Sequence, residues 1–151
     1  MFDVIGFDAD DTLWHNESIF TMTQEKFREI LSSHSPEVVD QTLSSTQIKN
    51  LEIFGYGIKG FILSMVETSI EITDGEIHGN EIQQIIDFGR EMLAAPTELL
   101  PYVQEVVDEL SKKYRLLLIT KGDLIDQEKK NCPFRISRLF YRCGNSERQK
   151  F

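Results

Sequence analysis

The sequence of 151 residues has no apolar run long enough to cross a bilayer and little cysteine. Its start, Met1-Phe2-Asp3, carries neither the basic region nor the apolar core of a signal peptide. The two cysteines, Cys132 and Cys143, both fall in the last segment, so a disulfide framework is not expected. We therefore expect a soluble, cytoplasmic protein with no membrane partner.

Positive charge is also scarce. The formal net charge is -9 at pH 7, which argues against nucleic acid as a partner. An anionic substrate would therefore need a local cation. The charge is uneven, because residues 131–151 hold five basic residues against one acidic residue. The character of the sequence changes near residue 130.

Two carboxylates, Asp8 and Asp10, follow the apolar run Val4-Ile5-Gly6-Phe7. Alternate side chains of an extended segment point the same way, so both carboxylates can face one reacting group. A short acidic cluster is more often a solvated turn, but its place directly after a predicted strand favours a site. A calcium loop is disfavoured, because no glycine stands at the sixth position from Asp8 and no glutamate at the twelfth.

The next part of the chain, to about residue 98, has a helical pattern. A capping Ser35 before Pro36 marks one helix start, and Asn80 is a candidate cap for a later one. Four helices are expected, over residues 17–34, 36–50, 58–72 and 80–95. The last of them has a predicted buried stripe of Ile82, Ile85, Ile86, Phe88 and Met92. Four helices in succession indicate a helical insertion.

A second strand is predicted over residues 116–119. Its continuous apolar run is typical of a strand buried on both faces. A helix over 101–113 precedes it, with inward positions at Val103, Val106, Val107 and Leu110. If the two strands are parallel neighbours, Thr120 and Lys121 arrive near Asp8 and Asp10.

These features resemble the haloacid dehalogenase (HAD) superfamily, whose first motif is Asp-x-Asp-x-Thr after a strand and whose second is Thr or Ser after another. The resemblance implies an α/β fold. A Rossmann-like core with a parallel sheet in three layers, here incomplete, would comprise residues 1–15 and 97–130. An α-helical cap would occupy residues 16–96, leaving 131–151 as a divergent tail.

The resemblance also implies a chemistry. Asp8 would be the nucleophile that takes up the phosphoryl group, and Asp10 the acid and base. The dehalogenase branch lacks this second aspartate, so the resemblance favours a Mg²⁺-dependent phosphatase of small phosphorylated metabolites. Thr12, Thr120 and Lys121 would bind the substrate phosphate. The Asp8 side chain and the Asp10 backbone carbonyl would hold the metal.

Several other residues have two interpretations. Trp14 and His15 could contact substrate or serve structurally at the hinge into the helical insertion. Phe54, Tyr56 and Phe61 could line a pocket, although packing between helices is the favoured role. The glycines of this region, Gly55, Gly57 and Gly60, are expected to allow a bend or close packing rather than to bind phosphate.

Two features of the superfamily are missing after Lys130: a later lysine, and an acidic pair at the end of another strand that completes the metal site. The alternative function is therefore a truncated, catalytically impaired fragment. Such a fragment would at most bind phosphate, metal or a partner. Its uncovered sheet edges and apolar faces would favour self-association.

The tail suggests that the reading frame shifts near codon 131. Codons permitted by the sequence from Asn131 onward, read in the +1 frame, can spell Ile-Ala-Arg-Ser-Gly-Leu-Ala-Asp-Tyr-Phe and, further on, Glu-Ile-Val and a lysine. That pattern resembles the superfamily's route into its third motif. Sequencing the gene tests this hypothesis. We expect the +1 codons to spell this segment, and codons that do not would disprove the frameshift.

Overall fold

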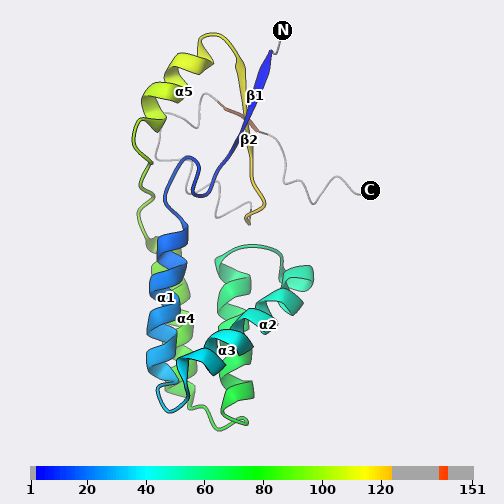
Figure 1. Cartoon of the computed structure of the whole chain (residues 1–151), viewed down its shortest axis with the longest axis vertical. Coiled ribbons are helices and arrows are strands. Elements are labelled where there is room, and N and C mark those ends of the chain that lie inside the picture. The colour runs from blue at the N-terminus through cyan, green and yellow to red at the C-terminus, as the bar shows by residue number, and fades with distance from the viewer. Residues whose placement is uncertain (1–2, 124–139, 143–151) are drawn as a thin grey trace. The chain divides into compact units, whose positions relative to one another are not determined.

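The computed structural model describes residues 3–123 and 140–142, and the side chains of 3–123. The chain divides into two compact units (Figure 1). One unit comprises the residues up to Glu17 together with those from Pro96 onward, and the other is Ser18–Ala95. Each unit is built around its own cluster of buried apolar side chains.

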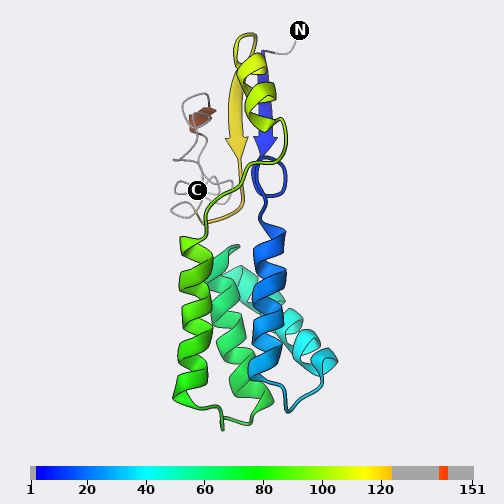
Figure 2. The same ribbon diagram turned by 90° about the vertical axis from the view of Figure 1, so that its left-hand side faces the viewer.

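The first unit is organised by a parallel sheet. Strand β1 (Val4–Asp8) pairs with β2 (Arg115–Ile119), and their arrows point the same way in Figure 2. A short third strand, β3 (Phe140–Arg142), pairs parallel with β2 on its other edge. Sequence patterns gave no sign of β3, because a strand this short has too few residues to display alternation.

Helix α5 (Val103–Ser111) packs on this sheet through Val103 and Val107. The predicted helix start at Pro101 is wrong, because Tyr102 adopts a left-handed conformation with φ 66° and the helix begins after it. The inward position predicted for Val106 is also wrong, since that side chain is 48% exposed. The core of this unit consists of Ala9, Leu13, Trp14, Val103, Val107 and Leu116.

The burial of β2 is less complete than its apolar sequence predicted. Leu116 is buried, Leu117 and Leu118 are partly buried, and Ile119 is 50% exposed. The prediction of a strand covered on both faces is therefore wrong at its carboxyl end. An apolar run records the composition of a strand and does not reveal which neighbours cover each face.

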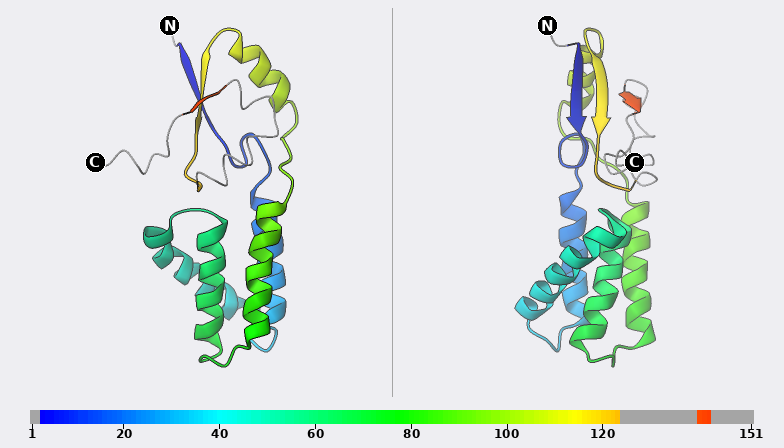
Figure 3. Two further views of the ribbon diagram at one scale, coloured as in Figure 1. Left: turned by 180° about the vertical axis from the view of Figure 1, so that it is seen from behind. Right: turned by 90° about the vertical axis from the view of Figure 1, so that its right-hand side faces the viewer.

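The second unit contains four helices (Figure 3). Their bounds are α1 (Glu17–Ile30), α2 (Pro36–Phe54), α3 (Ile58–Ile72) and α4 (Gly79–Ala94). Helices α1 and α4 lie side by side, and the Lys26 ammonium pairs with Glu91 across them at 2.7 Å. None of the helices in the described part of the chain is long and apolar enough to span a membrane.

The local start signals are partly confirmed. The Ser35 hydroxyl accepts from the Val38 N–H at 3.3 Å, and Pro36 is the first residue of α2, as predicted. The Asn80 cap is wrong, because His78 is the N-cap of α4 and its backbone N–H donates to Glu81 Oε2 at 2.9 Å. This capping box between His78 and Glu81 stabilises a helix start that lies before Asn80.

The turn between α2 and α3 depends on two glycines. Gly55 and Gly57 have φ values of 70° and 129°, in the region where side chains with a Cβ are strained. They reverse the chain within a few residues. A Cβ on Gly60 would lie 3.0 Å from the Gly55 carbonyl oxygen. The expectation that these glycines allow a bend and close packing is confirmed.

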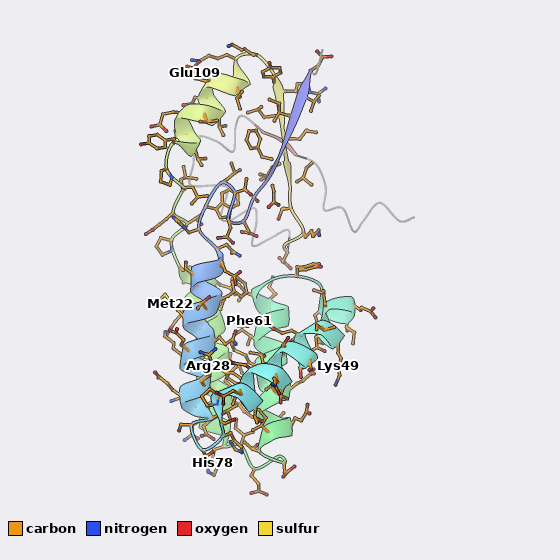
Figure 4. All side chains as sticks on the ribbon, viewed as in Figure 1. Met22, Arg28, Lys49, Phe61, His78 and Glu109 are labelled. Atoms are coloured by element: carbon orange, nitrogen blue, oxygen red, sulfur yellow. The ribbon has the colours of Figure 1, made fainter. Side chains whose placement is uncertain are left out.

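The helices enclose a core that contains Phe61 (Figure 4). The Phe61 ring packs against that of Phe20, with centroids 5.0 Å apart. Phe61 therefore has the packing role, whereas Phe54 and Tyr56 are each 45% exposed. Ile86, predicted to be buried, is 38% exposed. The cluster comprises Phe27, Leu31, Val39, Leu43, Ile58, Phe61, Met65, Ile85 and Met92.

An ion pair joins α1 to α2. The Arg28 guanidinium donates from Nε and Nη2 to the two carboxylate oxygens of Asp40, at 2.8 and 2.9 Å. Gln24 Nε2 donates to the same carboxylate at 2.9 Å. The hydrogen bond from Arg28, the largest cause, holds the pKa of Asp40 below its ordinary value and raises the pKa of Arg28.

Asp40→Asn should lower the free energy of unfolding at pH 7 by about 1 kcal/mol or less, because the pair is partly exposed. Folding lowers the pKa of Asp40. Its contribution to the free energy of unfolding is therefore present above the unfolded pKa of about 4, and it is lost as the pH falls through the lower folded pKa. Urea unfolding at several pH values measures this difference. Asp87→Asn, whose partner Arg90 has a side chain that is 69% exposed, is the control and should change stability by a few tenths of a kcal/mol. An Asp40→Asn deficit that persists undiminished at pH 2 would contradict the assignment.

Candidate active site

Asp8 is the last residue of β1 and is exposed to solvent. Its register partner on β2 is Ile119, so Thr120 follows at the same edge of the sheet. Carboxyl ends of parallel strands are where open α/β sheets bind ligands. The pairing therefore brings the nucleophile candidate Asp8 and the phosphate-binding candidate Thr120 to one edge.

A tight turn follows Asp8. The N–H groups of Thr12 and Leu13 donate to the Ala9 carbonyl at 3.2 and 2.8 Å. Ala9 and Leu13 are buried in the core, whereas Thr12 is exposed. The Thr12 hydroxyl donates to Asp8 Oδ2 at 3.3 Å. The turn thus ties Thr12 to the Asp8 carboxylate.

Asp10, the acid/base candidate, is half-buried in the same turn. Its Oδ1 accepts a hydrogen bond from the indole Nε1–H of Trp14 at 2.8 Å. Trp14 is fully buried. The sequence left open whether it contacts substrate or serves structurally, and its burial favours the structural role. His15 is exposed, and its backbone N–H donates to the Glu98 carbonyl at 3.0 Å.

Asp11 is a residue that sequence reasoning missed. It has φ 57°, and its carboxylate accepts from the backbone N–H of Asn16 at 2.9 Å and of Glu17 at 3.1 Å. These bonds satisfy donors at the start of α1, which begins at Glu17. Aspartate tolerates the left-handed conformation better than most residues. Aspartate is a residue type that often caps helices. Asp11, however, lies six positions before Glu17, too far from the helix for the sequence pattern to reveal this role.

The tip of β2 is also a turn. The Thr120 hydroxyl oxygen accepts from the Gly122 N–H at 3.2 Å, and a hydroxyl that accepts one bond can still donate another. Lys121 is exposed beside it. The structure therefore places Thr120 and Lys121 in sequence at the end of β2, with Asp8 at the end of the adjacent strand.

Metal-binding capacity in the described part of the chain is limited. Residues 3–123 contain no group of three or more histidine, cysteine, aspartate or glutamate side chains that could hold a metal ion. The exposed Asp8 carboxylate and the backbone carbonyl of Asp10 offer oxygen, the ligand type that Mg²⁺ prefers. Mg²⁺ retains several waters and takes one or two carboxylates plus substrate phosphate, so these atoms fit part of a shell.

No protein-family model and no curated protein matches the sequence. Among solved structures, a haloacid dehalogenase-like family hydrolase from Xanthomonas campestris is 42% identical, with a TM-score of 0.86 over 92% of this chain and 59% of that one. A putative HAD-hydrolase from Bacillus subtilis, bound to magnesium, is 14% identical, with a TM-score of 0.64 over 99% and 67%. L-2-haloacid dehalogenase from Xanthobacter autotrophicus is 14% identical, with a TM-score of 0.55 over 93% and 55%.

The chain has the fold of the haloacid dehalogenase superfamily, and over 92% of its own length it is similar to a haloacid dehalogenase-like family hydrolase. The predicted fold class, a Rossmann-like α/β core with an inserted helical cap, is confirmed. The chain spans 59% of the length of the Xanthomonas campestris hydrolase. The proposed frameshift near codon 131 lies outside the described residues and stays a prediction, as does the absence of the later lysine and of the acidic pair.

Asp11 variants should separate its two roles. Asp11→Ala loses the acceptor for the α1 N–H groups and must hold a left-handed conformation, which together cost about 1 to 3 kcal/mol. Asp11→Gly loses only the acceptor, and Asp11→Asn retains an acceptor oxygen and tolerates the conformation. Urea unfolding should therefore rank the destabilisation as Ala above Gly above Asn. Equal stability of Asp11→Ala and the wild type would disprove this capping role.

Proposed function

We propose that the chain derives from, and acts as, a Mg²⁺-dependent phosphatase of small phosphorylated metabolites that works through an aspartyl-phosphate. The observation that carries this proposal is the pair Asp8 and Asp10 at the tip of β1, with Asp10 fixed by the Trp14 indole at 2.8 Å. A hydrolase that expels halide needs no proton donor for its leaving group. A phosphatase that expels an alkoxide does, and a half-buried, anchored second aspartate suits that role.

In the first step, an Asp8 carboxylate oxygen attacks phosphorus and the bond from phosphorus to the ester oxygen breaks. The protonated Asp10 gives its proton to the departing oxygen, so the alcohol leaves neutral. In the second step, Asp10, now a carboxylate, removes a proton from water as the water oxygen attacks phosphorus. The bond to Asp8 breaks, inorganic phosphate leaves and both aspartates return to their starting states.

The remaining candidates would manage phosphate charge. Thr120 would donate its hydroxyl proton to a phosphoryl oxygen, and Lys121 would supply positive charge at the end of β2 in a chain whose net charge is -9. Thr12 keeps the Asp8 carboxylate in place through its 3.3 Å hydrogen bond. Mg²⁺, held by Asp8 and the Asp10 carbonyl, would neutralise negative charge on the phosphoryl group.

The alternative is a fragment that binds phosphate, metal or a partner without turnover. One observation favours it: residues 3–123 offer no cluster of three metal-ligating side chains. In this alternative the uncovered sheet residues, among them Val4 and Ile119 at 44% and 50% exposure, would favour self-association. Much of the rate of phosphoryl transfer comes from electrostatic positioning, so an incomplete site would lose most of it.

Hydrolysis of p-nitrophenyl phosphate with Mg²⁺ separates the two functions. If the chain is a phosphatase, Asp8→Asn should abolish turnover. Asp10→Asn should lower kcat by about 10² to 10⁴-fold, because the second step needs Asp10 as the base even though nitrophenolate leaves without a proton. Asp108→Asn, an exposed aspartate on α5, is the matched control and should retain wild-type kcat. Wild-type turnover no higher than that of Asp8→Asn would refute the phosphatase, and calorimetry with inorganic phosphate would then test the binding alternative.

A further inference from the structure

Trp14 is the single tryptophan of the chain, and its side chain is fully buried. The ring belongs to the core of the first unit, together with Leu13 before it and Val103, Val107 and Leu116 from α5 and β2. A large aromatic side chain in a close-packed core has little freedom to change rotamer. The ring is therefore a rigid element beside the candidate site.

The backbone around Trp14 is held from two sides. The Asp11 N–H donates to the Trp14 carbonyl at 2.8 Å, which closes the turn on itself. Trp14 also forms a bridge with Leu99, and its neighbour Leu13 accepts from the Leu100 N–H at 3.0 Å. Both the main chain and the side chain of Trp14 are thus fixed.

The polar atom of this buried ring meets the candidate acid/base. The Nε1–H of Trp14 donates to Asp10 Oδ1 at 2.8 Å, and Asp10 itself is half-buried. An indole N–H can only donate and a carboxyl oxygen can accept, so this bond ties Oδ1 of Asp10 to the buried ring.

We propose that Trp14 is a positioning residue for Asp10: through its indole N–H it fixes the carboxyl group on the core. This proposal rests on the proposed function for its catalytic meaning, but the contact itself can be tested without turnover. A phenylalanine at position 14 would fill most of the same space and lack the N–H. Asp10 would then lose this hydrogen bond, and its carboxyl group would be held less firmly.

The first test uses the indole proton of the full chain. Because there is one tryptophan, a ¹⁵N-labelled sample gives one indole Nε1–H cross-peak. Asp10→Asn changes the acceptor from a carboxylate to an amide and should shift this cross-peak, whereas Asp108→Asn on α5 should leave it in place. A cross-peak that does not respond to Asp10→Asn overturns the proposal, whatever the chain's activity.

The second test uses the leaving group. A nitrophenolate leaves readily without a proton, whereas an alkoxide depends on the acid. Trp14→Phe should lower kcat/KM for an alkyl phosphate about 10- to 100-fold and for p-nitrophenyl phosphate by a few-fold at most. Val107→Ala, which truncates a side chain of the same core cluster, is the matched control and should lower both values equally.

An equal loss for both esters in Trp14→Phe would show that Trp14 acts only on stability, and the positioning role would be wrong. Circular dichroism checks that both variants fold. If the wild-type chain has no turnover, the proposed function fails, while the indole cross-peak alone decides whether Trp14 holds Asp10. The two proposals can therefore fail separately.

Discussion

The parallel register between β1 and β2 is the constraint on which the candidate site depends. It pairs Asp8 with Ile119, two residues separated by more than a hundred positions in sequence. Because both strands run the same way, their polar ends share one edge of the sheet. An antiparallel pairing would place Thr120 and Lys121 at the opposite edge of the sheet from Asp8.

The turn after β1 joins this edge to the hydrophobic core. Its residues divide between two tasks: Ala9, Leu13 and Trp14 are buried, while Asp8, Asp10 and Thr12 carry the polar groups. Hydrogen bonds within the turn connect the two sets, from Thr12 to Asp8 and from Trp14 to Asp10. Packing in the core thereby restrains the two carboxylates.

The helical unit shows what local signals can and cannot predict. The bounds of α3 agree with the prediction, because a dense apolar stripe is followed by a turn containing Gly75. Helix α2 continues to Phe54, beyond its predicted end, because Gly55 supplies the stop and its signal lies past the apolar pattern. Ile86 and Val106 have helical spacing but are exposed, since spacing alone does not show how wide the covered face is.

The sequence by itself determined the local features: two apolar strands, four helices in succession, the helix start at Ser35 and Pro36, and an acidic motif typical of one superfamily. These depend on residues within a few positions of each other, so they can be read from spacing. Only the tertiary structure decided the pairing of β1 with β2, the short β3, the burial of Trp14 against Asp10 and the Asp11 contacts with the start of α1. Strand pairing and side-chain burial depend on residues that are distant in sequence or on how the backbone turns, and no local pattern encodes them.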